Sequence, residues 1–511
     1  MARAKPNFVV APPGATAVIK EEDKKMGVST QTGEATRTGL QPVLSLREKL
    51  GYGSGDVGFN FLFDMGQLYL LKFFTDALGI NPAIAGTIFL VAKIWDAFAD
   101  VAVGTWVDNR TKLGKRGKYR SFIFYATIPL ALMLIASFQI PDFSLTGRTI
   151  WAFAVYMLFG TVYSIANIPY GALVPAMTRN LQERSVLSSL RQGGGTLGLL
   201  ISTVVFWPIV NAFEDQAQGY TVAVTVFAIA GAVMIYVMYN NVQERFVGSP
   251  QTVQTAAPKV PLSTQYRLLF SNRPLMGLCL ANLAIFSAFN VRIAVQVYFT
   301  EYNLGDTWAL SFIGLFAIAW VFPGVAVTPW LTRRIGKRQT YILGCSIWFV
   351  ADFLAFFVVH DTLSLVILSS FTFFGSALPN SLNWAMVSDT VEYGEWKSGI
   401  RSEALTYSAF TWFRKLSQAI AGFIPGVVLA LVAYAPNVAQ QSERALFGIR
   451  ALMFLYPMAM SIFAIIAIWF VYKMSDERCV EIQEELCVRH AERDAGDGFD
   501  SPDLTGTLVT K

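Results

Sequence analysis

Residues 220–241 read YTVAVTVFAIAGAVMIYVMYNN and contain no charged side chain. A helix needs about 20 consecutive apolar residues to cross the hydrocarbon core of a bilayer. Eleven other stretches are similarly long and apolar. The sequence therefore predicts twelve membrane-spanning helices, at 55–79, 82–107, 120–140, 149–174, 186–211, 220–241, 275–298, 307–331, 339–359, 363–387, 404–433 and 447–472. The expected fold class is an all-α membrane protein.

The composition supports this fold class and excludes several others. Hydrophobic residues make up 54% of the chain and charged residues 15%, whereas an average soluble domain carries about 25% charged residues. There is no GxxxxGK[ST] phosphate-binding motif and there are two histidines, so we expect neither an ATP-driven pump nor an enzyme. The four cysteines lack metal-ligand spacing. We expect no cofactor beyond a coupling cation, and no nucleic-acid partner.

Basic residues in the loops predict the orientation of the chain in the membrane. An even number of spans places both termini on the same side. The loop after the second span carries six basic residues between 110 and 120, and the loop after the eighth carries four between 333 and 338. The loops after the first, seventh and ninth spans carry none. Because basic loops remain in the cytoplasm, we expect both termini there, in a bacterial cytoplasmic (inner) membrane.

The polar stretch 242–268 divides the spans into two groups of six. The basic loop at 106–116 has a weaker counterpart at 330–338, and each joins the second and third spans of its group. Paired halves with a substrate held between them near the midplane are a common transporter plan. The expected organisation is a disordered cytoplasmic tail at 1–45, an N-terminal six-helix half at 46–241, a central cytoplasmic loop at 242–268, a C-terminal six-helix half at 269–473 and an acidic cytoplasmic tail at 474–511.

Two carboxylates within the second span are the strongest candidates for function. Ionisable groups inside a membrane are costly unless they are paired or solvated. Asp96 and Asp100 are four residues apart and therefore lie on one helix face. Two such carboxylates repel each other unless a cation lies between them or one is protonated. The pair predicts a site for a coupling cation, Na⁺ or H⁺; the alternative is a structural ion pair with a basic group on another helix.

Polar residues on the first and fourth spans predict a sugar-binding face. Asn60 and Asp64 are one helical turn apart, and Gln67 follows one turn later. Asn167 lies near the end of the fourth span. Sugar hydroxyl groups need matched hydrogen-bond donors and acceptors. We therefore expect Asn60, Asp64 and Asn167 to bind the substrate.

Basic and aromatic residues inside three other spans complete the expected substrate site. Arg191 in the fifth span and Lys415 in the eleventh are candidates for binding an anionic substrate group or for pairing with a carboxylate. Trp384 in the tenth span can stack on a sugar ring, with apolar packing as the alternative.

Two charged residues near the end of the first span have simpler expected roles. Lys72 is expected to extend its ammonium group to the membrane interface. Asp76 is expected to mark the end of the helix.

Several short motifs occur in the order in which a known transporter family carries them. They are Gly53-Ser-Gly55-Asp56, Phe74-Thr75-Asp76, Trp95-Asp96-Ala97 with Asp100, Gly114-Lys115-Arg116, Asn167-Ile-Pro169-Tyr170-Gly171 and Asp389-Thr-Val-Glu392-Tyr393-Gly394-Glu395. With them the chain resembles the glycoside–pentoside–hexuronide:cation symporter family of the major facilitator superfamily over residues 46–485. The last motif, followed by Arg401 and Lys415, is highly specific to that family.

The resemblance implies a location for the coupling cation. In family members that carry melibiose, two aspartates of the second span bind the cation, and they match Asp96 and Asp100. Ser164 stands where those members have a threonine at the site, and Ala99 stands where they have an asparagine. The missing asparagine makes H⁺ at least as plausible as Na⁺.

The resemblance also implies a location for the substrate. The sugar-site aspartates of the melibiose-carrying members are replaced here by Asn60 and Asn167, while their arginine and lysine match Arg191 and Lys415. Fewer carboxylates favour an anionic sugar. Matches at Asn60, Asn167 and Trp384 make the chain more similar to the glucuronide carriers of the family than to the melibiose-carrying members. At Asp64 the chain departs from the glucuronide carriers.

The sequence thus predicts a sugar:cation symporter for glucuronide-like glycosides, working by alternating access as a monomer in the lipid bilayer. A symporter of pentosides (xylosides) or other neutral glycosides remains an alternative, as does a lysophospholipid symporter from another substrate class. Charge pairs in the cytoplasmic loops are expected to form and break during the cycle. Their candidate residues are Asp108, Arg110, Gly114, Lys115, Arg116, Asp389, Glu392, Glu395 and Arg401.

Overall fold

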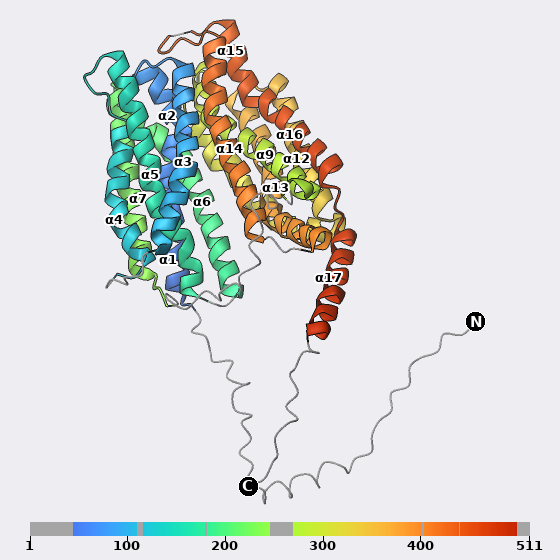
Figure 1. Ribbon diagram of the computed structural model, residues 1–511. Coiled ribbons are helices and arrows are strands. Elements are labelled where there is room, and N and C mark those ends of the chain that lie inside the picture. The colour runs from blue at the N-terminus through green and yellow to red at the C-terminus, as the bar shows by residue number, and fades with distance from the viewer. Residues whose placement is uncertain are drawn as a thin grey trace, which may run out of the picture. The chain divides into compact units, whose positions relative to one another are not determined.

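The computed structural model describes residues 44–109, 116–178, 181–245, 269–399, 403–438 and 440–497. These ranges fold into helices joined by short turns, as predicted (Figure 1). The first group comprises α1 (Leu46–Leu68), α2 (Leu70–Lys72), the π-helical η1 (Phe73–Ala77), α3 (Pro82–Asn109), α4 (Tyr119–Ser137), α5 (Leu145–Met177), α6 (Leu181–Val210) and α7 (Gln216–Asn241).

The second group begins after residue 268. It comprises α9 (Arg273–Tyr298), η2 (Phe299–Asn303), α10 (Ala309–Phe312), η3 (Ile313–Ala317), η4 (Ile318–Trp320), α11 (Val321–Ile335), α12 (Lys337–Val358), α13 (Thr362–Ser398), α14 (Glu403–Leu431), α15 (Glu443–Arg450), η5 (Ala451–Leu455), α16 (Tyr456–Ile466), η6 (Ala467–Tyr472) and α17 (Asp476–Asp497). The segments η2, η3, η5 and η6 are π-helical, and η4 is a 3₁₀ turn. The acidic tail therefore contains a helix of 22 residues, α17.

Ten of the described helices are long and apolar enough to cross a membrane. They account for the third to the twelfth predicted spans. The first two predicted spans are also helical, as α1–η1 and α3, but both carry several charged side chains along their length. Residues 1–43 of the predicted tail and residues 246–268 of the central loop lie outside the described residues.

Capping residues and glycines set several helix ends. Ser45 and Glu48 form a capping box at the start of α1, in which each side chain accepts a hydrogen bond from the other residue's backbone N–H. The Asp361 carboxylate caps α13 by accepting from the Ser364 N–H at 2.7 Å. Gly399 ends the same helix with φ of +71°, a conformation that glycine adopts without strain.

Within each group, neighbouring helices pack through small residues. In the first group α1 packs against α6 and α7, and in the second group α12 packs against α13. A Cβ atom at Gly58 would lie 2.7 Å from the Gly231 carbonyl oxygen, and one at Gly344 would lie 2.7 Å from that of Gly375. Such close approach requires glycine, as is common between membrane helices.

The two groups meet chiefly where α3 begins and α14 ends. A Cβ atom at Gly426 on α14 would lie 2.8 Å from the Cα atom of Gly86 on α3. A Cβ atom at Gly314 on η3 would lie 2.7 Å from Val204 on α6. These contacts lie towards the end of the helices opposite to the basic loops.

The ends of α1–η1 and of α9–η2 repeat the same local structure. Each has a π-helical turn that starts at a phenylalanine and closes on a leucine, with N–H to carbonyl distances of 3.0 Å for Leu78 to Phe73 and 3.2 Å for Leu304 to Phe299. A glycine follows each leucine, and both glycines have positive φ, +70° at Gly79 and +66° at Gly305. This repeat places Asp76 of the first group and Glu301 of the second at the same end of the molecule.

Candidate substrate and cation site

A half-buried ion pair joins α1 to α6. The Arg191 Nε lies 3.3 Å from Asp56 Oδ1, and Asn60 donates hydrogen bonds to the Asp56 carbonyl oxygen at 2.8 Å and to Oδ2 at 3.2 Å. Glycines on α6 allow the close approach, because a Cβ atom at Gly195 would lie 2.8 Å from Asp56 Oδ2. The prediction placed Asn60 and Arg191 in the site but gave no role to Asp56.

A second guanidinium group approaches this pair from α14. Arg414 lies 4.5 Å from the centre of the Phe286 ring, and its charge is close enough to Arg191 for the two to repel. The Arg414 side chain has no hydrogen bond or ion pair with any described residue. The Tyr163 phenol on α5 is within electrostatic range of Asp56 and both arginines. Asp56 is thus paired with Arg191 and lies within electrostatic range of Arg414.

Polar and aromatic side chains border this charged centre. Asn167 is half-buried, lies one turn beyond Tyr163 on α5, and its side chain makes no hydrogen bond with a described residue. Trp384 on α13 is 46% exposed and stacks on Tyr407 at 6.0 Å between ring centres. Tyr407 and Arg414 are seven residues apart on α14 and therefore share a face. The predicted ring-stacking residue thus lies beside the helix face that carries Arg414.

The three residues predicted to bind the cation, Asp96, Asp100 and Ser164, come together with Lys415. Asp100 forms an ion pair with Lys415 of α14 and accepts a hydrogen bond from the Ser164 hydroxyl of α5. Asp96 lies 3.2 Å from Lys93 on its own helix, and its Oδ1 is buried without a hydrogen-bond partner. Each carboxylate thus faces an ammonium group. In this conformation Asp100 forms an ion pair with a basic group on another helix, which was the expected alternative to a cation site.

Lys93 has a signal in the sequence that the prediction did not use. It precedes Asp96 by three residues, which places both on one helix face. The described residues contain no group of three or more His, Cys, Asp and Glu side chains able to hold a metal ion.

Asp64 is 5% exposed and accepts no hydrogen bond within the described chain. It is the one buried member of the predicted substrate set.

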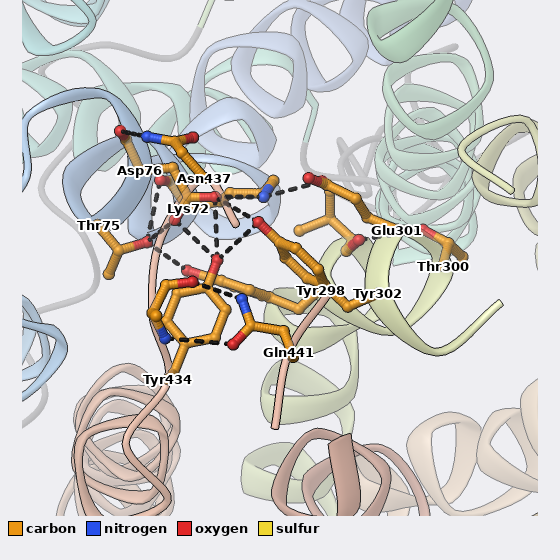
Figure 2. Close-up of polar contacts among 12 residues, drawn as sticks. Lys72, Thr75, Asp76, Tyr298, Thr300, Glu301, Tyr302, Tyr434, Asn437 and Gln441 are labelled. Atoms are coloured by element: carbon orange, nitrogen blue, oxygen red, sulfur yellow. Dashed lines mark hydrogen bonds and ion pairs between the residues drawn. The ribbon is translucent and has the colours of Figure 1, made fainter. Parts of the chain in front are cut away.

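Figure 2 shows a polar cluster that we call the Lys72 network: Lys72, Asp76, Glu301, Tyr302 and Tyr434. Lys72 Nζ lies 2.5 Å from Asp76 Oδ2 and 2.8 Å from Glu301 Oε2. The Tyr434 hydroxyl donates to Asp76 Oδ1 at 2.9 Å. The network joins η1 of the first group to η2 and the turn after α14 in the second.

The expectation that Lys72 extends to the interface is wrong. Its side chain is 1% exposed and lies between the rings of Tyr298 and Tyr302, 5.2 Å and 4.9 Å from their centres. Asp76 is not merely a boundary residue, since its carboxylate accepts hydrogen bonds from several side chains (Figure 2). The neighbouring sequence cannot reveal this, because Glu301 and Tyr302 come from the second group.

Three of the predicted loop residues, Asp389, Glu392 and Glu395, lie within α13 and not in a loop, because this helix continues to Ser398. Asp389 lies 2.5 Å from Lys337, and Glu392 accepts a hydrogen bond from Gln483 of α17 at 2.8 Å. Arg116 lies 3.9 Å from the centre of the Phe124 ring. Glu395 is buried. Arg110, Gly114, Lys115 and Arg401, and the side chain of Asp108, lie outside the described residues.

Comparisons with known proteins agree with these features. The family model described as MFS/sugar transport protein matches residues 51–476. The chain is 46% identical over 447 residues to the putative 2,3-dihydroxypropane-1-sulfonate exporter of Escherichia coli, covering 87% of this chain and 96% of the relative. It is 43% identical over 443 residues to the putative sulfoquinovose importer of that organism (87% and 94% covered). It is 33% identical over 448 residues to the glucuronide carrier protein homolog (87% and 96% covered).

Solved structures show the same fold at low sequence identity. A mutant form of the nucleoside transporter NupG matches with a TM-score of 0.60 at 14% identity, covering 83% of this chain and all of that one. The inward open form of the Escherichia coli xylose transporter XylE matches with a TM-score of 0.58 at 14% identity, covering 86% and 98%. All these relatives are transporters. The chain is therefore an integral membrane protein of the MFS/sugar transport protein family, a transporter and not an enzyme.

Proposed function

We propose that the protein is a secondary transporter for an anionic, polyhydroxylated substrate, such as a sulfonated sugar, a short hydroxyalkyl sulfonate or a hexuronide. The presence of two guanidinium groups at Asp56, Arg191 in an ion pair and Arg414 within electrostatic range, carries this proposal. Guanidinium groups bind sulfonate and carboxylate oxygens through directed, charge-assisted hydrogen bonds. The Asp56 carboxylate then occupies the place that the substrate anion takes.

The surrounding residues suit the remainder of such a substrate. Asn60, Asn167 and the Tyr163 hydroxyl supply donors and acceptors for hydroxyl groups. Trp384 offers an exposed ring face for a sugar ring. The relatives' names mention a sulfonated sugar, a dihydroxypropane sulfonate and a glucuronide, and these substrates share an anionic group and several hydroxyls.

The two alternative substrate classes fit the site less well. A neutral glycoside, as in the isoprimeverose transporter that is 32% identical to this chain, would leave Arg414 without a counter-charge. A lysophospholipid would need an apolar cleft, whereas the proposed site contains the charged residues Asp56, Arg191 and Arg414. We therefore favour an anionic polyol as the substrate over both of these classes.

We infer that Asp96, Asp100 and Ser164 bind the coupling cation, Na⁺ or H⁺, in a state in which Lys415 has left Asp100. In the described conformation the Lys415 ammonium group takes the place of that cation. Because Lys415 belongs to α14 and Asp100 to α3, separation of these helices would exchange one cation for the other. Ion binding and helix movement would then be linked.

We propose that α1–η1 and α3 also cross the membrane, which gives twelve spans in two halves, 46–241 and 269–473, with both termini cytoplasmic. The bacterial relatives support placement in the inner membrane. The Lys72 network then closes the outer side, opposite to the basic loops, and its rupture opens the site outward. A single chain holds both halves, so a monomer suffices.

The arginine pair is tested by transport into proteoliposomes. Uptake of sulfoquinovose, 2,3-dihydroxypropane-1-sulfonate and glucuronide should be saturable, and uptake of xylose should not exceed that of empty vesicles. A hydrogen bond to a charged group contributes about 1.5–3 kcal/mol. Arg414→Gln should therefore raise KM at least about tenfold, with exposed Arg333→Gln as the matched control. Unchanged KM in Arg414→Gln, or preference for xylose, would contradict the proposal.

The cation site is tested with a charge-balanced double variant. Asp100→Asn combined with Lys415→Gln removes the ion pair without leaving either charge alone in the membrane. We expect this protein to exchange substrate across the membrane but to lose accumulation driven by a Na⁺ or H⁺ gradient. Full gradient-driven accumulation, measured against the wild type in the same vesicles, would remove Asp100 from the coupling mechanism.

Native cysteine labelling tests the topology. Cys487 on α17 is exposed, whereas Cys279, Cys345 and Cys479 are buried. A membrane-impermeant maleimide should label Cys487 only after the cells are permeabilised. Cysteine placed at exposed Asp142, between α4 and α5, should react in intact cells. Labelling of Cys487 in intact cells would place the C-terminus outside.

A further inference from the structure

Asp64 is an aspartate within a helix that has no basic partner in the described chain. Several other helical aspartates do have one. Asp56, Asp76, Asp96, Asp100 and Asp352 each lie beside a lysine or arginine. Asp64 is 5% exposed, its Oδ2 is fully buried, and neither oxygen accepts a hydrogen bond from a described residue.

The helices around Asp64 offer no counter-charge. Its ionisable neighbours are Asp56 on the same helix and the phenols of Tyr69 and Tyr163. On the helices packed against α1, Arg191 of α6 is engaged by Asp56, and Arg292 of α9 is engaged by Asp352 at 2.6 Å.

Two other nearby cations are also occupied, and Arg414 of α14, which is unpaired among the described residues, acts electrostatically on Asp56 but not on Asp64. Lys72 of α2 is shared by Asp76 and Glu301, and Lys93 of α3 is paired with Asp96. The helix α7 contains no charged residue, and α4 contains a single one, in its first turn. A carboxylate buried this deeply, without a neighbouring cation, is costly inside a membrane.

We propose that Asp64 is a proton-binding residue in addition to the cation site at Asp96 and Asp100: it holds a proton in the described conformation and releases it when α1 and its neighbours rearrange. The proton comes from water on one side of the membrane, forms an O–H bond with the Asp64 carboxylate, and leaves to water on the other side. This site is separate from the lysine-paired Asp96 and Asp100.

Asp64 is placed to link the proton to an anionic substrate, and this link rests on the proposed function. It lies two helical turns from Asp56, on the same face. A negative charge at Asp64 would oppose an anion bound at Arg191, whereas the neutral acid would not. Substrate and proton therefore bind better together than alone. Gln67, one turn further along, lines a small cavity with Lys93 and Gln418, which supplies polar surroundings next to the site.

Infrared spectroscopy of the purified protein tests the proton directly, whether or not a substrate is known. Wild-type protein at neutral pH should show the C=O stretch of a neutral carboxyl group, and Asp64→Asn should lack it. Asp361→Asn is the matched control, because the backbone hydrogen bond from Ser364 lowers the pKa of this exposed carboxyl and keeps it ionised. A band that persists in Asp64→Asn, or that is absent from the wild type, overturns the proposal.

Transport then tests the coupling. In proteoliposomes containing a pH-sensitive dye, sulfoquinovose uptake by the wild type should bring protons with it. Asp64→Asn, which resembles the protonated acid, should still exchange substrate while its proton uptake per substrate falls below that of the wild type. Proton uptake per substrate equal to that of the wild type in Asp64→Asn contradicts the proposal. Wild-type protein that shows the infrared band but carries none of the test substrates contradicts the proposed function instead.

Discussion

The fold and the site both depend on the high cost of an unpaired charge in the membrane interior. A helix can carry a carboxylate there only if another side chain neutralises it or a proton does so. Arg292 and Asp352 illustrate the static solution, with side chains 1% and 0% exposed, completed by hydrogen bonds between Arg292 and Ser369 and from Thr372 to Asp352. Both residues belong to the second group, so helix movement between the groups leaves this pair intact.

Other pairs span the two groups and must exchange partners if the groups separate. Lys415 of α14 faces Asp100 of α3, and Lys72 of α2 faces Glu301 of η2. Each pair leaves a charged group alone when it breaks, and that is costly unless water, a cation or a substrate anion replaces the lost partner. Entry of a ligand and movement of the helices would thereby be interdependent, as the proposed alternating access requires.

Much of the helix pattern and part of the site could be predicted from the sequence. Apolar runs located the helices, and the four-residue spacing of Asp96 and Asp100 placed both carboxylates on one face. The place of Ser164 beside them followed from the family resemblance, and Lys415 was a candidate carboxylate partner because it lies inside a span. The cross-chain partners could not be predicted, because local spacing does not tell which helices lie together. Asp76 and Tyr302 are 226 residues apart, yet their side chains meet. The membrane-interface role expected for Lys72 failed for the same reason.

The most direct test of alternating access measures the distance across the closed end of the molecule. Spin labels at exposed Ile84, near the start of α3, and exposed Leu431, at the end of α14, lie beside the Gly86–Gly426 contact. Electron–electron double resonance on the reconstituted protein should give a short distance between the two labels. The Glu301→Gln substitution, which weakens the Lys72 network, should produce a second, longer distance between them. A single distance, unchanged by that substitution and by substrate, would contradict the account.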